Sequence, residues 1–501
     1  MGAIVAPSPD ISVREGRNLK TKPWGHQCNA IDFLRDAPWT FRAPIDRFHP
    51  DYPGWKRSAV PEGGAGYLAM WMGTGKTLVG VSMACNLAID TCLIAAPKRV
   101  VPVWPQQFQL HADRNDLLIL ALGDHRPIKQ KTSQADLTLK LARAAKKRFI
   151  VVVNYEMLWR PPFNEWALDQ TWGLTIFDEI HRIKQASGRQ SMFAAHLRDR
   201  SVYRLGLSGT PLPHSPLDAY AQYRFLEPSI YGTSNAAFKA RYAVYGGFQN
   251  KQVLRFVNLP DFEERMGRIM FRVGKDVLDL PEEVKITREC DLAPTAARIY
   301  GDMEREFVAQ VKDGLVTAAN AMTKLIRLQQ ITSGFVKLES GEEQPIDDAN
   351  AKGELLLEHF EDIEPGEPVV VFCRYKHDLR LVHGLAKAAG RSSLELSGDR
   401  DELALWQAGG ANVLAVQIQA GGLGVDLTRA RYAIYYSIGF NLGEYEQALA
   451  RVHRPGQSQT TFQIHLAVGN SIDTRVMKAL EKRQDLVQSI LDAIRSESPN
   501  A

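Results

Sequence analysis

Short apolar runs recur along this 501-residue chain in two separate series, one between residues 67 and 208 and one that begins at residue 369. Near-continuous apolar runs of this length are typical of parallel strands that helices cover on both faces. With 45% hydrophobic residues, the chain can give each series its own core. The pattern therefore predicts two α/β units, with strands at Leu93–Ala96, Phe149–Val153, Leu174–Phe177, Tyr203–Leu207, Val369–Phe372, Val413–Gln417, Tyr432–Tyr436 and Phe462–Ala467.

Between the two series, helical patterns at Ala296–Val311 and Leu315–Gln330 precede an acidic stretch, Leu338–Asn350. Apolar residues at helical spacing from Ile472 to Ile494 predict a closing helix. We therefore predict four segments: an N-terminal extension (1–20), a first lobe (21–230), a helical insertion with a linker (231–350) and a second lobe (351–495).

Sixty-one Lys and Arg residues oppose 57 Asp and Glu, and the net charge of +4 is too small for this length to predict a polyanionic partner by itself. The five cysteines form no Cys-x-x-Cys pair, so neither a disulfide framework nor a zinc site is indicated. No secretion signal is visible, and no apolar stretch approaches the roughly 20 residues of a membrane helix. We expect a soluble monomer inside the cell, in the cytoplasm or nucleoid, or in the host cytoplasm if the chain is viral.

A phosphate-binding loop is indicated by MWMGTGKT at 70–77, which precedes a predicted helix, Leu78–Leu87. Gly73 and Gly75 allow backbone N–H groups to surround phosphates. Lys76 is expected to contact the β- and γ-phosphate oxygens, and Thr77 to bind Mg²⁺. Met70 stands where the usual pattern has its first glycine. The alternative is a chance glycine-rich turn, which a second motif downstream makes less favourable.

That second motif is LTIFDEIH at 174–181, an apolar run that ends in Asp178 and Glu179. The carboxyl ends of parallel strands line the ligand crevice of α/β sheets. Asp178 is expected to hold Mg²⁺ through water, and Glu179 to orient and deprotonate the attacking water. An acid pair alone is often a helix N-cap, but a lysine loop upstream makes that reading unfavourable.

A pair of arginines in QALARVHRPGQ at 447–457 is the third candidate. Arg451 and Arg454 lie three residues apart, which predicts one face of a helical turn for both. A guanidinium delivered to the γ-phosphate stabilises the charge of the transition state. By itself, such a pair is more often a solvent-exposed or salt-bridged surface.

Taken in chain order, these motifs resemble those of superfamily 2 helicases, in the Swi/Snf-like branch of DNA translocases and chromatin remodellers. The motifs are WGHQ at 24–27, MGTGKT at 72–77, DEIHRIK at 178–184, SGTPL at 208–212, QAGGLGVDL at 419–427 and QALARVHRPGQ at 447–457. FRVGKDVLDLPEEV at 271–284 resembles a further segment of that branch. The resemblance implies two RecA-like parallel-sheet lobes with a helical insertion between them. One departure follows SGTPL, where Pro213, His214 and Ser215 replace a frequent Gln-Asn-Asn run.

The resemblance also implies a role for each motif residue. Gln27 is implied to contact the adenine, and Gly424 and Asp426 the region of the ribose. ATP and Mg²⁺ are implied to be held by the loop residues Met72, Gly73, Thr74, Gly75, Lys76 and Thr77. Coupling of the nucleotide state to the rest of the protein is implied for His181, Ser208, Thr210 and Gln447. Contacts with the nucleic-acid backbone are implied for Lys98, Arg99, Asn154, Tyr155, Gln419, Gly421 and Gly422.

Two basic clusters are further candidates for phosphate contacts. Residues 126–148 carry eight Lys or Arg against one acid, and residues 239–275 carry eight against three. A solvated helix face is an equally good interpretation of each. Backbone contacts carry no base information, so we expect little sequence preference on double-stranded DNA and targeting by a protein partner.

The sequence therefore predicts an ATP-driven translocase on double-stranded DNA. A helicase that separates or anneals strands is the first alternative. A clamp or recruitment protein that binds nucleic acid without hydrolysing ATP is an alternative of another class. A phosphate-loop kinase or transport ATPase does not explain the motifs of the second lobe.

Overall fold

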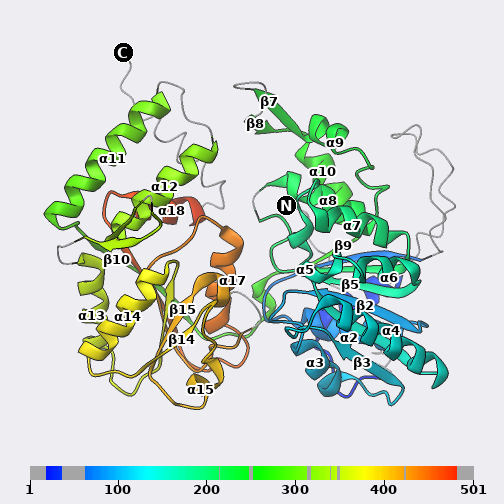
Figure 1. Ribbon diagram of the computed structural model, residues 1–501. Coiled ribbons are helices and arrows are strands. Elements are labelled where there is room, and N and C mark those ends of the chain that lie inside the picture. Colours follow the sequence, from blue (N-terminus) through cyan, green and yellow to red (C-terminus); the bar gives the residue numbers. More distant parts are fainter. Residues whose placement is uncertain are drawn as a thin grey trace. The chain divides into compact units, whose positions relative to one another are not determined.

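The computed structural model describes residues 18–36, 63–213, 215–246, 252–312, 318–338, 340–346, 350–421 and 425–481 (Figure 1). The chain forms two compact units, which divide between Val277 and Leu278. Each unit contains one parallel sheet with helices packed against it. The predicted α/β class with two parallel-sheet lobes is therefore confirmed.

The first unit is built on seven strands in the order β3-β4-β2-β5-β6-β1-β9. Strands such as β2 are buried at every position because helices cover both faces of the sheet. The strands are β1 (Ala65–Met70), β2 (Thr91–Ala96), β3 (Leu117–Ala121), β4 (Arg148–Asn154), β5 (Trp172–Asp178), β6 (Ser201–Ser208) and β9 (Met270–Val273). A separate antiparallel hairpin pairs β7 (Ala243–Gly246) with β8 (Gln252–Phe256).

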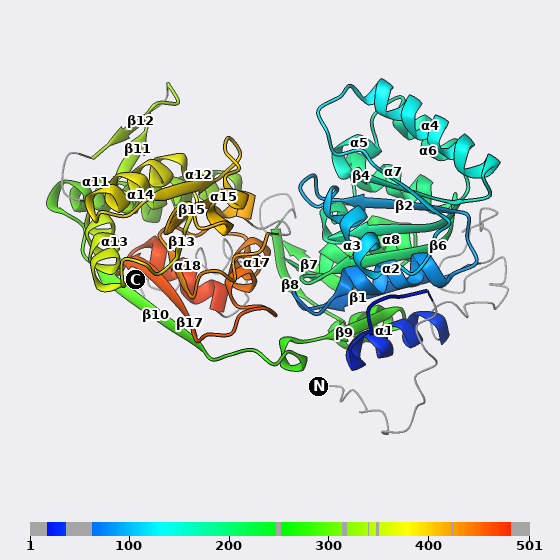
Figure 2. The same ribbon diagram turned by 90° about the horizontal axis from the view of Figure 1, so that it is seen from below.

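Helices α1 to α3 form the core on one face of this sheet, and α4 to α10 form it on the other. Figure 2 shows α1 on one side of the sheet and α4 with α6 on the opposite side. The helices are α1 (Gly25–Asp36), α2 (Lys76–Asn86), α3 (Val103–His111), α4 (Ile128–Ala144), α5 (Tyr155–Leu158), α6 (Phe163–Asp169), α7 (Arg189–Arg198), α8 (Ala219–Leu226), α9 (Asn235–Tyr242) and α10 (Leu259–Gly267). Short 3-10 helices are η2 (Ile180–Ile183), η3 (Pro216–Asp218) and η5 (Lys275–Val277).

The second unit is built on six strands in the order β10-β17-β16-β13-β15-β14. They are β10 (Glu283–Cys290), β13 (Val369–Cys373), β14 (Ser393–Leu396), β15 (Val413–Gln417), β16 (Tyr432–Tyr435) and β17 (Thr461–Val468). Helices α11, α12, α17 and α18 pack on one face, and α13 and α14 on the other. The helices are α11 (Pro294–Lys312), α12 (Ala318–Thr332), α13 (Ala351–Asp362), α14 (Lys376–Ala388), α15 (Leu403–Gln407), α16 (Ile418–Gly421), α17 (Leu442–Val452) and α18 (Ile472–Glu481), and β11 (Phe335–Lys337) pairs with β12 (Glu343–Pro345).

The predicted helical insertion, residues 231–350, does not form a domain of its own. Its first part belongs to the first unit, because β9 pairs in parallel with β1 and extends that sheet. Its second part belongs to the second unit, because β10 pairs with β17 along its whole length. Two predicted segments are only partly described by the structure. Residues 1–17 of the N-terminal extension (1–20) and the part of the closing helix (Ile472–Ile494) that follows Glu481 lie outside the described residues.

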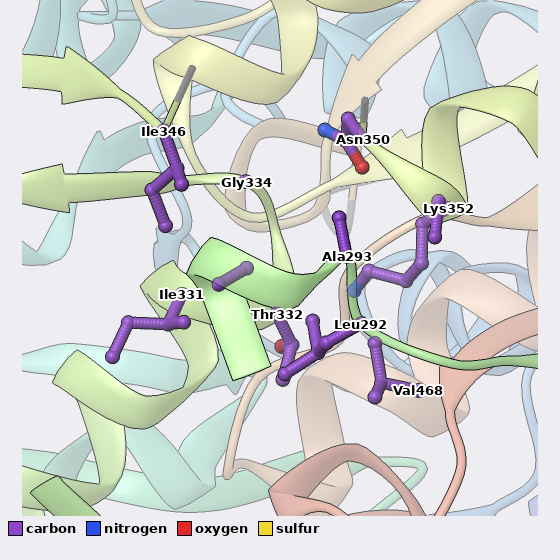
Figure 3. A pocket seen from close by; sticks show the side chains of 11 residues that line it. Leu292, Ala293, Ile331, Thr332, Gly334, Ile346, Asn350, Lys352 and Val468 are labelled. Atoms are coloured by element: carbon purple, nitrogen blue, oxygen red, sulfur yellow. The ribbon is translucent and has the colours of Figure 1, made fainter. Parts of the chain in front are cut away.

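A buried ion pair holds α13 to α18 in the second unit, and a hydrogen bond joins α12 to the same carboxylate. Lys352 Nζ lies 3.0 Å from Asp473 Oδ2, and Asp473 Oδ1 accepts a 2.9 Å hydrogen bond from Thr332 Oγ1. Lys352 also donates to the backbone oxygen of Tyr436. Figure 3 shows the Lys352 side chain at the wall of a small pocket beside this network. The end of α12, which lies in the predicted insertion, is thus tied to α18 by a hydrogen bond as well as by apolar packing.

Candidate nucleotide-binding site

The loop between β1 and α2 has the curvature that a phosphate site requires. Gly73 and Gly75 have φ angles of 82° and 85°, in the left-handed region that favours glycine. Gly75 is the N-cap of α2, so the first backbone N–H groups of α2 are available at the positive end of its dipole. A Cβ at Gly75 would lie only 2.1 Å from Gln27 Nε2, so any side chain at this position would force Gln27 to move.

Lys76 lies against this loop, where its Nζ donates to the backbone oxygens of Met70 (2.8 Å) and Trp71 (3.2 Å). The first turn of α1 is tied to the same loop. Gln27 Nε2 donates to Thr74 O at 3.0 Å, and its Oε1 accepts from the Trp24 backbone N–H. The WGHQ and MGTGKT motifs are therefore brought together, as the resemblance to superfamily 2 helicases implies.

Asp178 ends β5 and is buried beside the loop. Its Oδ2 accepts a 3.1 Å hydrogen bond from Trp104 Nε1, and its backbone oxygen accepts a 2.8 Å hydrogen bond from the Tyr155 hydroxyl. Burial and the neighbouring Glu179 carboxylate raise the pKa of Asp178 to about 7, against the opposing effect of the Lys76 charge. The loop lysine and the two acids thus share one electrostatic environment.

Glu179 has φ 54°, a left-handed conformation that non-glycine residues rarely adopt outside functional sites. Its Oε2 lies 3.4 Å from both Ser208 Oγ and His181 Nδ1, and those two atoms lie 2.9 Å apart. Ser208 Oγ also accepts from the Thr210 backbone N–H. Thr210 Oγ1 is buried and has no hydrogen-bond partner among the described residues. Three of the four residues predicted to couple the site, His181, Ser208 and Thr210, thus form one network at the ends of β5 and β6.

In the second unit, Arg451 is buried in the last turn of α17, together with Gln447. The helix ends at Val452, so the prediction that Arg451 and Arg454 share one helical face is wrong. The physical reason is Pro455, because the residue before a proline is disfavoured in helical conformation. Arg454 Nη1 instead donates to the backbone oxygen of Val425 at 3.2 Å.

Asp426 is exposed, and its Oδ1 accepts hydrogen bonds from the backbone N–H and the hydroxyl of Thr428. His453, between the two arginines, has Nε2 2.8 Å from the backbone oxygen of Pro281. The sequence analysis did not single out this contact with the segment that precedes β10. Gly424, the other residue predicted near the ribose, lies outside the described residues.

The residues predicted to contact nucleic acid differ in how exposed their side chains are. Lys98 and Gln419 are exposed, and Arg99 and Asn154 are half-buried. Tyr155 is fully buried, so its side chain is not exposed to nucleic acid, and a contact through its backbone stays a prediction. Its hydroxyl is committed to Asp178, and the side chain supports the acid site instead. Of the two glycines in this set, Gly421 ends α16 and Gly422 lies outside the described residues.

In each basic cluster, at least three of the eight basic side chains form ion pairs within the first unit. In residues 126–148, Arg126 and Lys131 pair with Asp124, and Lys140 Nζ lies 2.6 Å from Asp136. In residues 239–275, Arg241 and Arg265 share Asp261, and Arg268 pairs with Glu264. These ion pairs favour the interpretation of both clusters as solvated surfaces over the interpretation as phosphate-binding sites.

Two other arginines stand out at the surface of the first unit. Arg160 and Arg189 are exposed, and each guanidinium carbon lies 5.2 Å from the centroid of the Trp159 ring. Neither arginine forms an ion pair within the part of the chain that the structure describes. Sequence reasoning missed them because their spacing is not periodic.

The described residues contain no group of three or more His, Cys, Asp or Glu side chains that could hold a metal ion. Among the same residues, no helix is both long enough and apolar enough to cross a membrane.

A glycine loop with a lysine, an acid pair at the end of a neighbouring strand and a second parallel-sheet lobe define a helicase-type ATPase of the phosphate-loop class. The profile of the SNF2-related domain matches residues 27–334, and the profile of the helicase conserved C-terminal domain matches residues 351–456. The chain therefore belongs to the SNF2-related family.

Similar proteins occur in phages, bacteria and eukaryotes. A phage protein, p41 of Acyrthosiphon pisum secondary endosymbiont phage 1, is 24% identical over 454 residues, which cover 85% of this chain and 94% of p41. An ATP-dependent helicase of Mycoplasma genitalium is 22% identical, with 87% of this chain and 41% of the helicase covered. The transcription regulatory protein SNF2 of Saccharomyces cerevisiae is 25% identical, with 85% and 26% covered. The chain thus spans less than half of these two cellular relatives.

Among solved structures, the SWI2/SNF2 ATPase core of Sulfolobus solfataricus in complex with dsDNA matches 97% of this chain and 96% of its own, at 19% identity and a TM-score of 0.42.

Proposed function

We propose that this protein is a translocase that couples ATP hydrolysis to movement along double-stranded DNA. The single observation that carries the proposal is the network in the first unit that links Glu179, His181 and Ser208 beside Asp178. Such a network connects the hydrolytic acid pair to the SGTPL segment of the neighbouring strand, as a motor needs if hydrolysis is to be converted into motion.

In this proposal, Thr77 and Asp178 hold the Mg²⁺ that accompanies ATP. The residues fit such an ion, because Mg²⁺ is usually bound through one or two carboxylates together with substrate phosphates and water. A buried carboxylate beside a second one also favours a divalent cation, since the cation offsets the burial and the repulsion by Glu179 that together raise the pKa of Asp178. When bound, the ion neutralises charge on the β- and γ-phosphates.

Glu179 would then orient the attacking water and accept its proton, while Lys76 leaves the loop carbonyls for the phosphate oxygens. Gln27 would contact the adenine, and Asp426 and Gly424 the ribose region. Ser208, Thr210 and His181 would relay the state of the γ-phosphate, with Gln447 as their counterpart in the second unit. Arg451 and Arg454 would supply positive charge to the transition state.

Lys98, Arg99, Asn154 and Gln419 are proposed to contact the phosphate backbone. Arg160 and Arg189 are added because both are exposed cations held on one indole ring and not neutralised by a described carboxylate. Each phosphate contact releases condensed counterions, so binding should weaken steeply with salt. A Bacillus subtilis relative that is 24% identical carries the name ATP-dependent helicase/translocase, which supports movement along nucleic acid as the output.

The test is ATP hydrolysis by the purified chain with duplex DNA, single-stranded DNA and RNA. We expect duplex DNA to stimulate hydrolysis most. Glu179→Gln and Lys76→Ala should abolish turnover and leave DNA binding largely intact, whereas Asp169→Asn, an exposed acid in the same unit, should behave as the wild type. Full turnover by Glu179→Gln would refute its role as the base.

A strand-separating helicase is the second candidate. Displacement of a third strand from a triplex without unwinding of a forked duplex supports translocation, and the reverse result supports strand separation. A clamp that does not hydrolyse ATP is excluded as soon as DNA-stimulated turnover is measured.

A further inference from the structure

One buried tryptophan bridges the acid strand and the helix that follows the phosphate loop. Trp104 lies in α3 with no exposed surface, and its Nε1 donates to Asp178 Oδ2 at 3.1 Å. The far edge of the same ring lies against α2, where a Cβ placed on Gly80 would be 3.0 Å from Trp104 Cη2. The indole therefore touches both sides of the site proposed to hold the nucleotide.

The chemistry of the indole makes this contact directional. Its N–H is a donor only and does not titrate, so it can stabilise the carboxylate but cannot exchange roles with it. The hydrogen bond commits Oδ2 of Asp178, and the Tyr155 hydroxyl fixes the backbone of the same residue from β4. Asp178 is thus held at Oδ2 of its carboxylate and at its backbone oxygen before any ligand binds.

We propose that Trp104 is a positioning residue for the metal: it orients the carboxylate of Asp178 so that its remaining oxygen receives the Mg²⁺ that accompanies ATP. This inference rests on the proposed ATP site. Partners of this kind, one step behind a metal ligand, fix ligand orientation, and their loss typically costs about 10- to 100-fold in metal affinity.

The competing explanation is that Trp104 only fills the apolar core and does not orient Asp178. A second buried aromatic residue of α3 serves as the control for this explanation. Phe108 is equally buried in α3, and its ring centroid lies 6.1 Å from that of Trp104. It packs in the same apolar cluster but lacks a polar group to reach Asp178. Phe108→Leu therefore perturbs packing alone.

The experiment measures binding of a fluorescent ATP analogue to the full chain in Mg²⁺ and in excess EDTA, with a thermal melt of each variant. Trp104→Phe keeps most of the ring volume and removes the N–H. We expect it to raise the half-saturating Mg²⁺ concentration for nucleotide binding by about 10-fold or more. Affinity in EDTA should stay within about twofold of the wild type. Phe108→Leu should lower the melting temperature and leave the Mg²⁺ dependence unchanged.

A Trp104→Phe protein with the wild-type Mg²⁺ dependence would overturn the inference, as would an equal loss of affinity with and without Mg²⁺. If Trp104→Phe does not fold, Gly80→Ala replaces it, because the added methyl displaces the ring edge and leaves the N–H present. It should also raise the half-saturating Mg²⁺ concentration, and an unchanged value would again overturn the inference. Failure of the wild type to bind nucleotide in a Mg²⁺-dependent way would instead refute the proposed ATP site.

Discussion

The substitution Gly75→Ala tests the geometry of the phosphate loop through two separate costs. The first is conformational, because φ is 85° and an L-residue in the left-handed region costs roughly 1–2 kcal/mol. The second is steric, because the new methyl would lie 2.1 Å from Gln27 Nε2. Gln27 must then withdraw from Thr74 O, and a lost hydrogen bond of this kind costs about 0.5–1.5 kcal/mol. The middles of the two ranges add to about 2.5 kcal/mol, so we take about 2–3 kcal/mol as the total.

The free-energy cost of Gly75→Ala can appear either as a loss of stability or as a loss of nucleotide affinity, depending on whether the loop changes its conformation. If the loop keeps its curvature, the free energy of unfolding of the first unit falls by about 2–3 kcal/mol. If the loop relaxes, its N–H groups turn away from the phosphates, and nucleotide affinity falls by roughly 30- to 150-fold at 1.4 kcal/mol per tenfold. Urea unfolding and nucleotide titration of the same preparation therefore have to be read together.

Gly267→Ala is the matched control, since a Cβ at that helix terminus meets nothing within 4 Å. In a Gln27→Ala background the hydrogen bond to Thr74 O is already absent, so Gly75→Ala should there cost only the conformational part, about 1–2 kcal/mol. A Gly75→Ala protein with wild-type stability and wild-type nucleotide affinity would show that the loop does not have the geometry described.

Three further predictions concern stability and nucleic-acid binding. Lys352→Met should lower the free energy of unfolding, measured in a thermal or urea melt, by about 3–5 kcal/mol because it leaves the Asp473 carboxylate buried and unpaired. The additional substitution Asp473→Leu should restore part of this loss, and additive costs of the two substitutions would argue against a buried pair. Tyr155→Phe should cost about 1–3 kcal/mol of unfolding free energy and leave DNA affinity unchanged, and a large loss of affinity at constant stability would contradict its burial. Neutralising Arg160 and Arg189 together should lower the salt slope of duplex binding by about 1.8 at constant melting temperature, and an unchanged slope would remove them from the binding surface.

The two sheets could be predicted because their central strands are buried on both faces. A strand such as β15 consists almost entirely of buried apolar residues, which makes it visible as a continuous run. β10 (EVKITREC) gives no apolar run because it lies at the edge of its sheet, where each of its positions is half-buried or exposed. β9 is only four residues long. Missing both edge strands caused the prediction of a separate helical insertion.

The order and spacing of the motifs in the sequence locate the nucleotide site. They do not reveal the direction in which each side chain points. The helix end at Val452 was available from the sequence, since Pro455 disfavours a helical Arg454. The burial of Tyr155 and Trp104 was not available, because aromatic residues occur both in cores and at ligand surfaces, and only tertiary packing distinguishes the two.

These two aromatic residues suggest how nucleic acid and nucleotide are connected within one lobe. Asn154 and Lys98 belong to the segments proposed to contact the backbone, while Tyr155 and Trp104, close to them in sequence, point inward to Asp178. A phosphate bound at Lys98 or Asn154 would thus contact the same segments that position the carboxylate of Asp178. We predict that Tyr155→Phe and Trp104→Phe lower the ratio of DNA-stimulated to basal ATP hydrolysis, measured at saturating Mg²⁺. Equal losses of stimulated and basal rates would mean that these residues serve the nucleotide site alone.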